Sequence, residues 1–504
     1  MADPVVPLTA QSVRGTVWTL ANQLGVVARS PGELVGALTG LGVTGVVVVP
    51  QSPAAGEPAE VDEAAELVRA LRDLGHIRLV TAPGRERGSG REGAATGVVV
   101  PKSPPLPSGG ATGAVTDDGL VRDAPFGASD LGDPAAVCTA DPSSVTAAFE
   151  HGPHGPHGPH GPHGRYEGDG PEGRAGGGDG PHGGARGDHG PEAGPETRPD
   201  EHGGLRAAWF RAGQSLIREQ PPAQRALVLL TALGDDADPR LRPALNALAA
   251  TAPWRSDWTR VRGDVSPPWP GPVAALAQGT GRWSGHLLVA DQRGAIRSVH
   301  PADAAPAPGT ATLPVRITAL APMPDGALLM LDERGRLRTH GDTPLTDAVA
   351  ATLDAHPGTA LAATSRLVLV GDRHGSLHAF GHGGMHQAAA HRGRVTAVAV
   401  ADGPAAVVCS GGSDGTVRTW TPGRSTDDTP LAERGCAVTA LAAHGRTLAV
   451  AWADGLVELR RLGTDEALPL RPGPPVRAVA VTGERSVVVG TDDTLFRVTA
   501  RALP

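Results

Sequence analysis

The stretch HRGRVTAVAVADGPAAVVCSGGSDGTVRTWTPG, residues 391–423, decides the fold of the C-terminal half of the chain. Its first strand pattern is VTAVAV (395–400), its second is AVVCSGG (406–412), and its third, after an Asp-Gly pair, is TVRTW (416–420). Valine-rich alternation indicates half-buried strands, and Asp-Gly between two such runs indicates a tight hairpin, because the turn requires positive φ. The stretch therefore predicts a small antiparallel sheet.

This unit recurs along the second half of the chain. The segments VADQRGAI, LDERGRL, VGDRHGSL, GGSDGTV, AWADGLV and GTDDTLF align on the residue that closes the turn. Those turn residues are Gly294, Gly335, Gly375, Gly415, Gly455 and Asp493, at intervals of 41, 40, 40, 40 and 38 residues. One such four-stranded sheet of about 40 residues cannot bury both of its faces, so copies must stack, and closure into a ring leaves only short edges exposed. The sequence predicts an all-β propeller with six visible repeats.

The unit at 391–423 resembles the WD-repeat family. In that family a His before the first strand, a Ser or Thr in the second, an Asp in the turn and a Trp in the third form a hydrogen-bonded network. The resemblance gives these structural roles to His391, Ser410, Asp414 and Trp420. The other units are degenerate, and a quinoprotein-like or other propeller is the alternative.

The number of blades stays open at six or seven, because the repeats show six whereas the resemblance favours seven. The last unit reaches Pro504 with no room for a fourth strand. We expect the segment WTRVRGDV (258–265) to supply that strand, which would join residues near 260 to residues near 500.

The first 150 residues predict a small α/β domain, because helical patterns alternate with strand patterns and the valine run at 46–49 is typical of a buried parallel strand. The helices are expected at 12–25, 30–42, 59–76 and 141–150, and the strands at 26–28, 44–50, 77–83, 97–103 and 136–139. The chain contains no GKS or GKT, no GxSxG and no HExxH motif. A nucleotide-binding or hydrolytic enzyme in this domain, with the propeller as its regulatory module, is therefore the alternative function.

Residues 151–203 predict a disordered linker rich in His, Gly and Pro. Weak binding of a transition metal is the alternative interpretation of its histidines, which are His151, His154, His157, His160 and His163. Residues 204–255 predict a helical segment that packs on the first domain or forms a collar under the propeller, and 256–504 is the predicted propeller domain. Trp254, Trp258 and Trp269 are expected to be buried at a domain junction.

Composition narrows the function. The net charge of −8 does not indicate a basic face for nucleic acid, the three cysteines show no metal-site spacing, and no apolar run is long enough to cross a membrane. The single lysine among 45 basic residues fits GC-rich bacterial coding. We expect a cytoplasmic, non-catalytic scaffold or sensor that has no cofactor and binds a protein or peptide, with Arg373, Arg394 and Arg446 on its interaction face.

Overall fold

The structure is a computed structural model. It describes residues 5–7, 12–41, 45–50, 58–74, 77–82, 130–151, 202–261, 273–312, 315–341, 345–401, 406–426 and 429–502.

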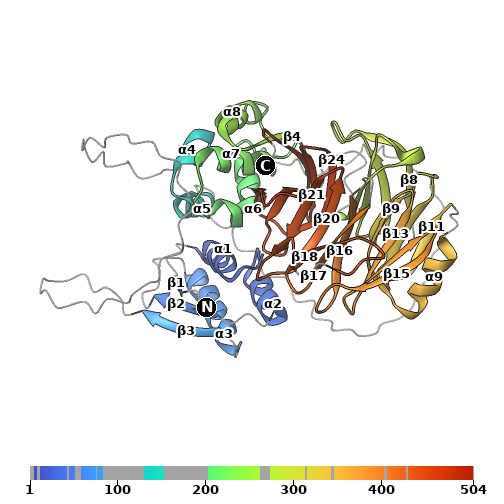
Figure 1. Ribbon diagram of the computed structural model, residues 1–504. Helices are drawn as coiled ribbons and strands as arrows, with labels where there is room; N and C mark the ends of the chain where they lie inside the picture. The colour runs from blue at the N-terminus through green and yellow to red at the C-terminus, as the bar shows by residue number, and fades with distance from the viewer. Residues whose placement is uncertain are drawn as a thin grey trace, which may run out of the picture.

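Six antiparallel sheets form the C-terminal part of the molecule, one for each repeat in the sequence (Figure 1). We call them blades 1 to 6. Blades 1 to 3 are β5–β8 (Val273–Gln278, Leu287–Asp291, Ala295–Val299, Pro306–Thr312), β9–β11 (Ile317–Pro322, Leu328–Asp332, Leu337–His340) and β12–β15 (Gly358–Ala363, Leu367–Asp372, Ser376–Gly381, Gly384–Ala389). Blades 4 to 6 are β16–β19 (Val395–Ala401, Val407–Gly412, Thr416–Trp420, Ala432–Glu433), β20–β23 (Val438–His444, Thr447–Trp452, Val457–Arg461, Ala467–Leu470) and β24–β26 (Val476–Gly483, Ser486–Thr491, Thr494–Ala500) with β4 (Trp254–Val261).

The six blades close into a ring. Each innermost strand contacts the innermost strand of the next blade, and β24 of blade 6 contacts β5 of blade 1. The outer strand of blade 6 is β4, which pairs antiparallel with β26 from Thr494 opposite Val261 to Ala500 opposite Trp254. The predicted fold class, a multidomain chain with a C-terminal propeller, is confirmed, and the blade number is six. The upstream closing strand is also confirmed, but it begins at Trp254, four residues earlier than predicted.

The hairpin between the second and third strands of a blade is longer than the predicted Asp-Gly turn. In blade 4 it is a three-residue loop, 413–415, in which the glycine alone has positive φ, +75° at Gly415. A Cβ at Gly415 would lie 2.1 Å from the carbonyl oxygen of Arg434, so the close backbone approach also requires glycine. Blade 6 differs, because there the hydroxyl of Thr491 accepts the N–H groups of Asp493 and Thr494.

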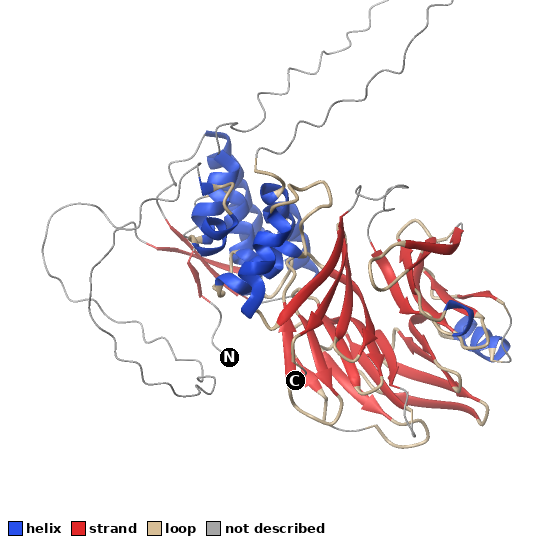
Figure 2. Ribbon diagram, turned by 90° about the horizontal axis from the view of Figure 1, so that it is seen from above, coloured by secondary structure: helices blue, strands red, loops and turns tan. Residues whose placement is uncertain are grey.

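Blade 2 departs from the predicted four-strand pattern. Its described residues form three strands, and helix α9 (Thr346–Ala355) follows the third strand. Val349 and Leu353 of α9 are buried against the hydrophobic core between blades 2 and 3, which includes Leu331 and Leu361. A helix therefore shields the apolar surface that an outer strand would otherwise help to cover. It lies at the edge of the ring far from the other helices (Figure 2).

The remaining elements precede the propeller in the chain. Strands β1 (Val5–Pro7), β2 (Gly45–Pro50) and β3 (Ile77–Ala82) form a parallel sheet in that order. The helices are α1 (Val13–Leu24), α2 (Pro31–Leu41), α3 (Pro58–Asp73), α4 (Pro134–Thr139), α5 (Pro142–His151), α6 (Leu205–Leu216), α7 (Pro222–Leu230) and α8 (Leu241–Leu248). We call these helices and strands the helical unit. Figure 2 shows its helices gathered on one side of the propeller.

Two strand predictions in the first half were wrong. Residues 26–28 form no strand, because the carbonyl of Val26 and the N–H of Ala28 form hydrogen bonds with the side chain of Gln214. Residues 136–139 belong to α4, in which Asp133 caps the first turn by accepting the N–H of Ala135 and Pro134 follows at the first helical position. This helix start outweighs the strand preference of Val137. The predicted strand at 97–103 lies outside the described residues.

One continuous hydrophobic core joins the helical unit to the propeller. It contains Trp18 of α1, Trp209 of α6 and Leu229 of α7, together with Ala451 in blade 5 and Phe496 in blade 6. Helices between residues 204 and 255 contact both parts of the molecule: α6 contacts α1, and α7 contacts β4 of the propeller. The division of the chain at residues 150 and 203 stays a prediction.

Candidate functional site

The structure brings together three of the four residues assigned to the blade 4 network. His391 Nε2 lies 2.9 Å from the hydroxyl of Ser410, and Nδ1 lies 3.1 Å from Asp414 Oδ1. Thr416, which the sequence analysis did not name, joins them through its hydroxyl, 2.9 Å from the same Asp414 oxygen. Trp420 does not join them: its indole N–H donates to the carbonyl of Arg424 at 2.9 Å.

The electrostatics of this network favour a neutral imidazole. Burial lowers the pKa of His391, although Asp414 acts in the opposite direction. Burial alone would raise the pKa of Asp414, but the N–H of Arg392 and the groups of Thr416 and His391 lower it. A neutral His391 that donates from Nδ1 to Asp414 can accept the Ser410 proton at Nε2. All of these groups are then satisfied within blade 4, so the network holds the blade together.

The exposed arginines at one end of the blades form a more open surface. We call this end, which carries the turns between second and third strands, the turn face. Arg373 lies in the blade 3 turn and Arg394 in the connection to blade 4, where its carbonyl accepts the N–H of Ser413 at 2.9 Å. Arg446 lies in the loop between the first and second strands of blade 5, at the opposite end, and donates to Leu462. The predicted interaction face therefore does not include Arg446 together with the other two.

Four further exposed arginines accompany Arg373 and Arg394 on the turn face of blades 1 to 4. They are Arg293, Arg316, Arg334 and Arg392. We call these six residues the arginine arc. The sequence repeat contained a signal for the arginine arc, because Arg293 and Arg334 each directly precede a turn glycine. The aspartates of the blade 1 and blade 2 turns point inward, since Asp291 and Asp332 are 2% exposed and accept backbone N–H groups of their own turns, whereas Glu333 of the blade 2 turn is exposed.

The central channel of the ring is narrow. A one-residue bulge in each first strand places one side chain in the channel, and these residues are Ala274, Thr318, Thr359, Thr396, Thr439 and Arg477. Thr396 donates to the carbonyl of Gly411 at 3.0 Å, and Thr359 donates to that of Gly371 at 3.1 Å. These two hydroxyls thus form hydrogen bonds with backbone carbonyl groups at the bulges. The cavity volume of about 90 Å³ leaves room for a few water molecules only.

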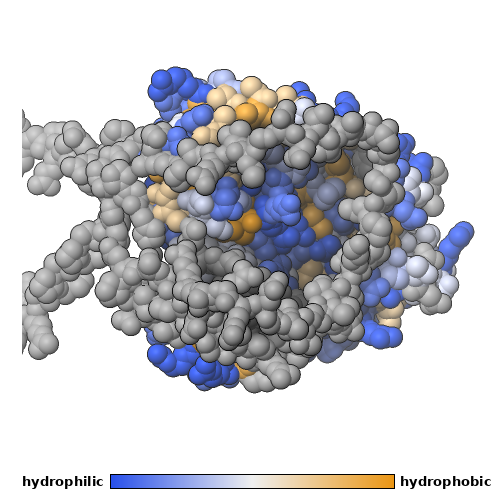
Figure 3. Space-filling view, turned by 90° about the vertical axis from the view of Figure 1, so that its left-hand side faces the viewer, coloured by the Kyte–Doolittle hydropathy of each residue, from blue (hydrophilic) through white to orange (hydrophobic). Residues whose placement is uncertain are grey.

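The helical unit covers the turn face of blades 5 and 6. Gln214, which is 6% exposed, donates to the carbonyl of Val26 at 2.7 Å and accepts the N–H of Ala28 at 3.1 Å, so its amide fixes residues 26–28. Arg29, next in the chain, forms an ion pair with Asp493 of blade 6. Figure 3 looks onto this side of the molecule, where hydrophilic residues dominate the floor of the hollow in the middle.

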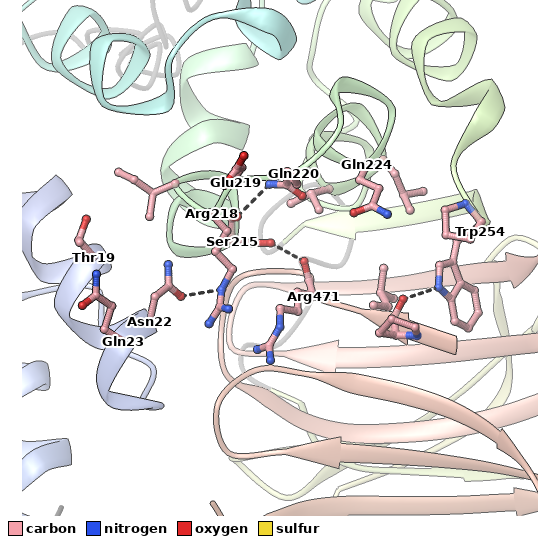
Figure 4. Close-up of a pocket in the computed structure, with 16 residues that line it drawn as sticks. Thr19, Asn22, Gln23, Ser215, Arg218, Glu219, Gln220, Gln224, Trp254 and Arg471 are labelled. Atoms are coloured by element: carbon pink, nitrogen blue, oxygen red, sulfur yellow. Dashed lines mark hydrogen bonds between the residues drawn. The ribbon is translucent and has the colours of Figure 1, made fainter. Parts of the chain in front are cut away.

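A larger cavity lies where the helical unit meets blade 5 (Figure 4). Its volume is about 600 Å³, within the range of small-molecule sites. Its walls come from α1, from α7 and its connection to α6, from the start of β4 and from the end of β23. Ser215 of α6 donates to the carbonyl of Arg471 at 2.6 Å, and Trp254 donates to that of Pro469 at 2.9 Å, so both sides are held in place. No sequence motif indicated this cavity, because its residues are far apart in the chain.

Other predicted features are located as follows. His151 ends α5, and the other four histidines of the tract lie outside the described residues. Within the described ranges no group of three or more His, Cys, Asp or Glu could hold a metal ion. Trp254 and Trp258 are buried, as predicted, while Trp269 is outside the described residues. None of the described helices is both long enough and apolar enough to span a membrane.

Comparisons with known proteins do not identify a family for this chain. No protein-family model matches the chain, and no curated protein sequence matches it. Among solved structures, the computationally designed Ika8 protein has 22% sequence identity and a TM-score of 0.32, over 45% of this chain and 70% of Ika8. The β-propeller domain of Cps50 (Swd1) from Myceliophteria thermophila has 14% identity and a TM-score of 0.33, over 49% of this chain and 91% of that domain. The strand pairing of this chain itself defines it as a six-bladed propeller protein.

Proposed function

We propose that this protein is a non-catalytic interaction scaffold that binds an acidic segment of a protein partner on the arginine arc. The observation that carries the proposal is the exposure of six arginines on the turn face of blades 1 to 4. Guanidinium groups on a rigid ring suit carboxylates, because each planar group can donate two parallel hydrogen bonds. Among the described residues, the helical unit covers the turn face of blades 5 and 6, which leaves the arc as the uncovered part of this face.

Charge reversal with a matched control tests this function. We expect affinity purification to recover one stoichiometric partner with the unchanged protein and to lose it with the double variant Arg373→Glu, Arg394→Glu. Arg446→Glu is the control, since it reverses the charge of one exposed arginine at the opposite end of a blade. Binding should also weaken as ionic strength rises, because exposed charge pairs are screened.

Two outcomes would contradict the proposal. One is a partner that remains bound to the double variant, and the other is a partner lost equally with Arg446→Glu. Retention of a labelled nucleotide by the same preparation would support the alternative, an enzyme in the first 150 residues.

A further inference from the structure

The cavity between the helical unit and blade 5 contains an arginine without a counter-charge. Arg218 follows α6 and lines the cavity. Its Nε donates to Asn22 Oδ1 at 2.9 Å, which fixes the plane of the guanidinium. Among the described residues, no hydrogen-bond acceptor meets its two terminal nitrogens. Figure 4 shows this guanidinium between Asn22 and Arg471.

The carboxylates near the cavity do not form an ion pair with Arg218 in the described part of the chain. Asp454 of blade 5 forms ion pairs with both Arg434 and Arg471, so its carboxylate is already shared between two guanidinium groups. Glu219 lines the cavity but is exposed, and no ion pair in the described part of the chain joins it to Arg218. Burial and the neighbouring Arg471 lower the pKa of Arg218 to about 10. A bound anion would supply the missing negative charge.

The rest of the lining has a mixed character. Leu227, Val228 and Leu470 contribute apolar surface, and the side-chain amides of Gln23 and Gln224 lie at the cavity without a hydrogen bond to any described residue. Apolar walls with a few fixed polar groups are typical of sites for small organic molecules.

We propose that this cavity binds a small organic carboxylate. The carboxylate accepts two hydrogen bonds from the terminal nitrogens of Arg218, and the carbon skeleton packs on Leu227, Val228 and Leu470. A single planar guanidinium matches a carboxylate in a bidentate geometry. The second cation of the cavity, Arg471, is engaged by Asp454, so one free group is available to the ligand.

Titrations of the full chain followed by thermal unfolding test the site. The probes are acetate, succinate, hexanoate and benzoate, with benzamide as the neutral counterpart of benzoate and inorganic phosphate as the other anion. We expect saturable stabilisation by benzoate or hexanoate, with an affinity roughly tenfold to a hundredfold above that of benzamide, the range of a hydrogen-bonded charge. Arg218→Gln should remove this difference, whereas Arg240→Gln, at a side chain 90% exposed on the helical unit, should leave it unchanged.

A second variant keeps the test decisive if Arg218→Gln fails to fold. Gln23 is exposed at the rim of the cavity, and Gln23→Glu adds a negative charge there without disturbing the core. We expect it to weaken benzoate binding about tenfold. The proposal is overturned if no carboxylate stabilises the protein in a saturable way, if phosphate binds more tightly than benzoate, or if Arg218→Gln binds benzoate as well as the unchanged protein does.

Discussion

Replacing Gly490 with alanine measures the closure of the ring. Gly490 lies in β25 of blade 6, and a Cβ there would come within 2.6 Å of Val273 Cγ1 in blade 1. Because real side chains do not approach so closely, blades 6 and 1 must move apart. Such overpacking costs about 1–3 kcal/mol, and the lower entropy of the unfolded chain offsets about 0.4–1 kcal/mol of that. We expect a net loss in the middle of the resulting range, about 1–2 kcal/mol in the free energy of unfolding, or a melting temperature lower by roughly 2–8 °C.

Urea denaturation followed by tryptophan fluorescence provides the assay, with two alanine variants as references. Gly483 lies in the same blade, where a Cβ would meet no atom within 4 Å, and it should tolerate alanine without loss. Gly411 lies at the corresponding contact between blades 4 and 5, where an added Cβ would be 2.4 Å from Val438 Cγ1. Gly411→Ala should therefore lower the free energy of unfolding as much as Gly490→Ala does. If Gly490→Ala is as stable as Gly483→Ala while Gly411→Ala is destabilised, blades 6 and 1 are not in contact and the closed ring is refuted.

Two further predictions concern buried polar groups. Gln214→Leu should reduce the free energy of unfolding by about 2–5 kcal/mol, because it leaves the carbonyl of Val26 and the N–H of Ala28 without partners; unchanged hydrogen exchange at the Ala28 amide would contradict this. The folded-state pKa of His391 lies below its unfolded value of about 6.5, so the unfolded chain takes up the proton first and stability falls as pH drops below that value. The stability difference between the unchanged protein and His391→Asn should therefore shrink from about pH 7.5 to about pH 5.5, and a constant difference would argue against a neutral, buried His391.

The propeller could be predicted from the sequence because its repeat is fixed by geometry. All five turn glycines have positive φ, and at Gly335, Gly375 and Gly415 an added Cβ would also clash with a backbone carbonyl oxygen, so glycine recurs at a constant spacing. The helix of blade 2 was missed although Leu345, Val349 and Leu353 show helical spacing. The expectation of a fourth strand in every repeat outweighed that local pattern.

The sites were less predictable for a physical reason. The arginine arc follows from the position of each arginine beside a turn, so the aligned repeats contained the signal even though the net charge of the chain hid it. The carboxylate cavity has no such signal. Asn22, Arg218 and Arg471 come together only because α1, α6 and the end of blade 5 pack on one another, and the spacing of residues along the chain does not encode that packing.

The contacts between the helical unit and blade 5 explain how the proposed cavity would influence the rest of the molecule. Gly473, with φ +107°, brings the backbone of blade 5 so near to Ala212 that a Cβ would lie 2.4 Å from its carbonyl oxygen, and the apolar core continues across this contact. Arg218 belongs to the helical unit, whereas Leu470 belongs to blade 5, so a ligand that touches both binds only when the two parts are docked. Such a ligand stabilises the docked arrangement in proportion to the logarithm of its concentration relative to its dissociation constant.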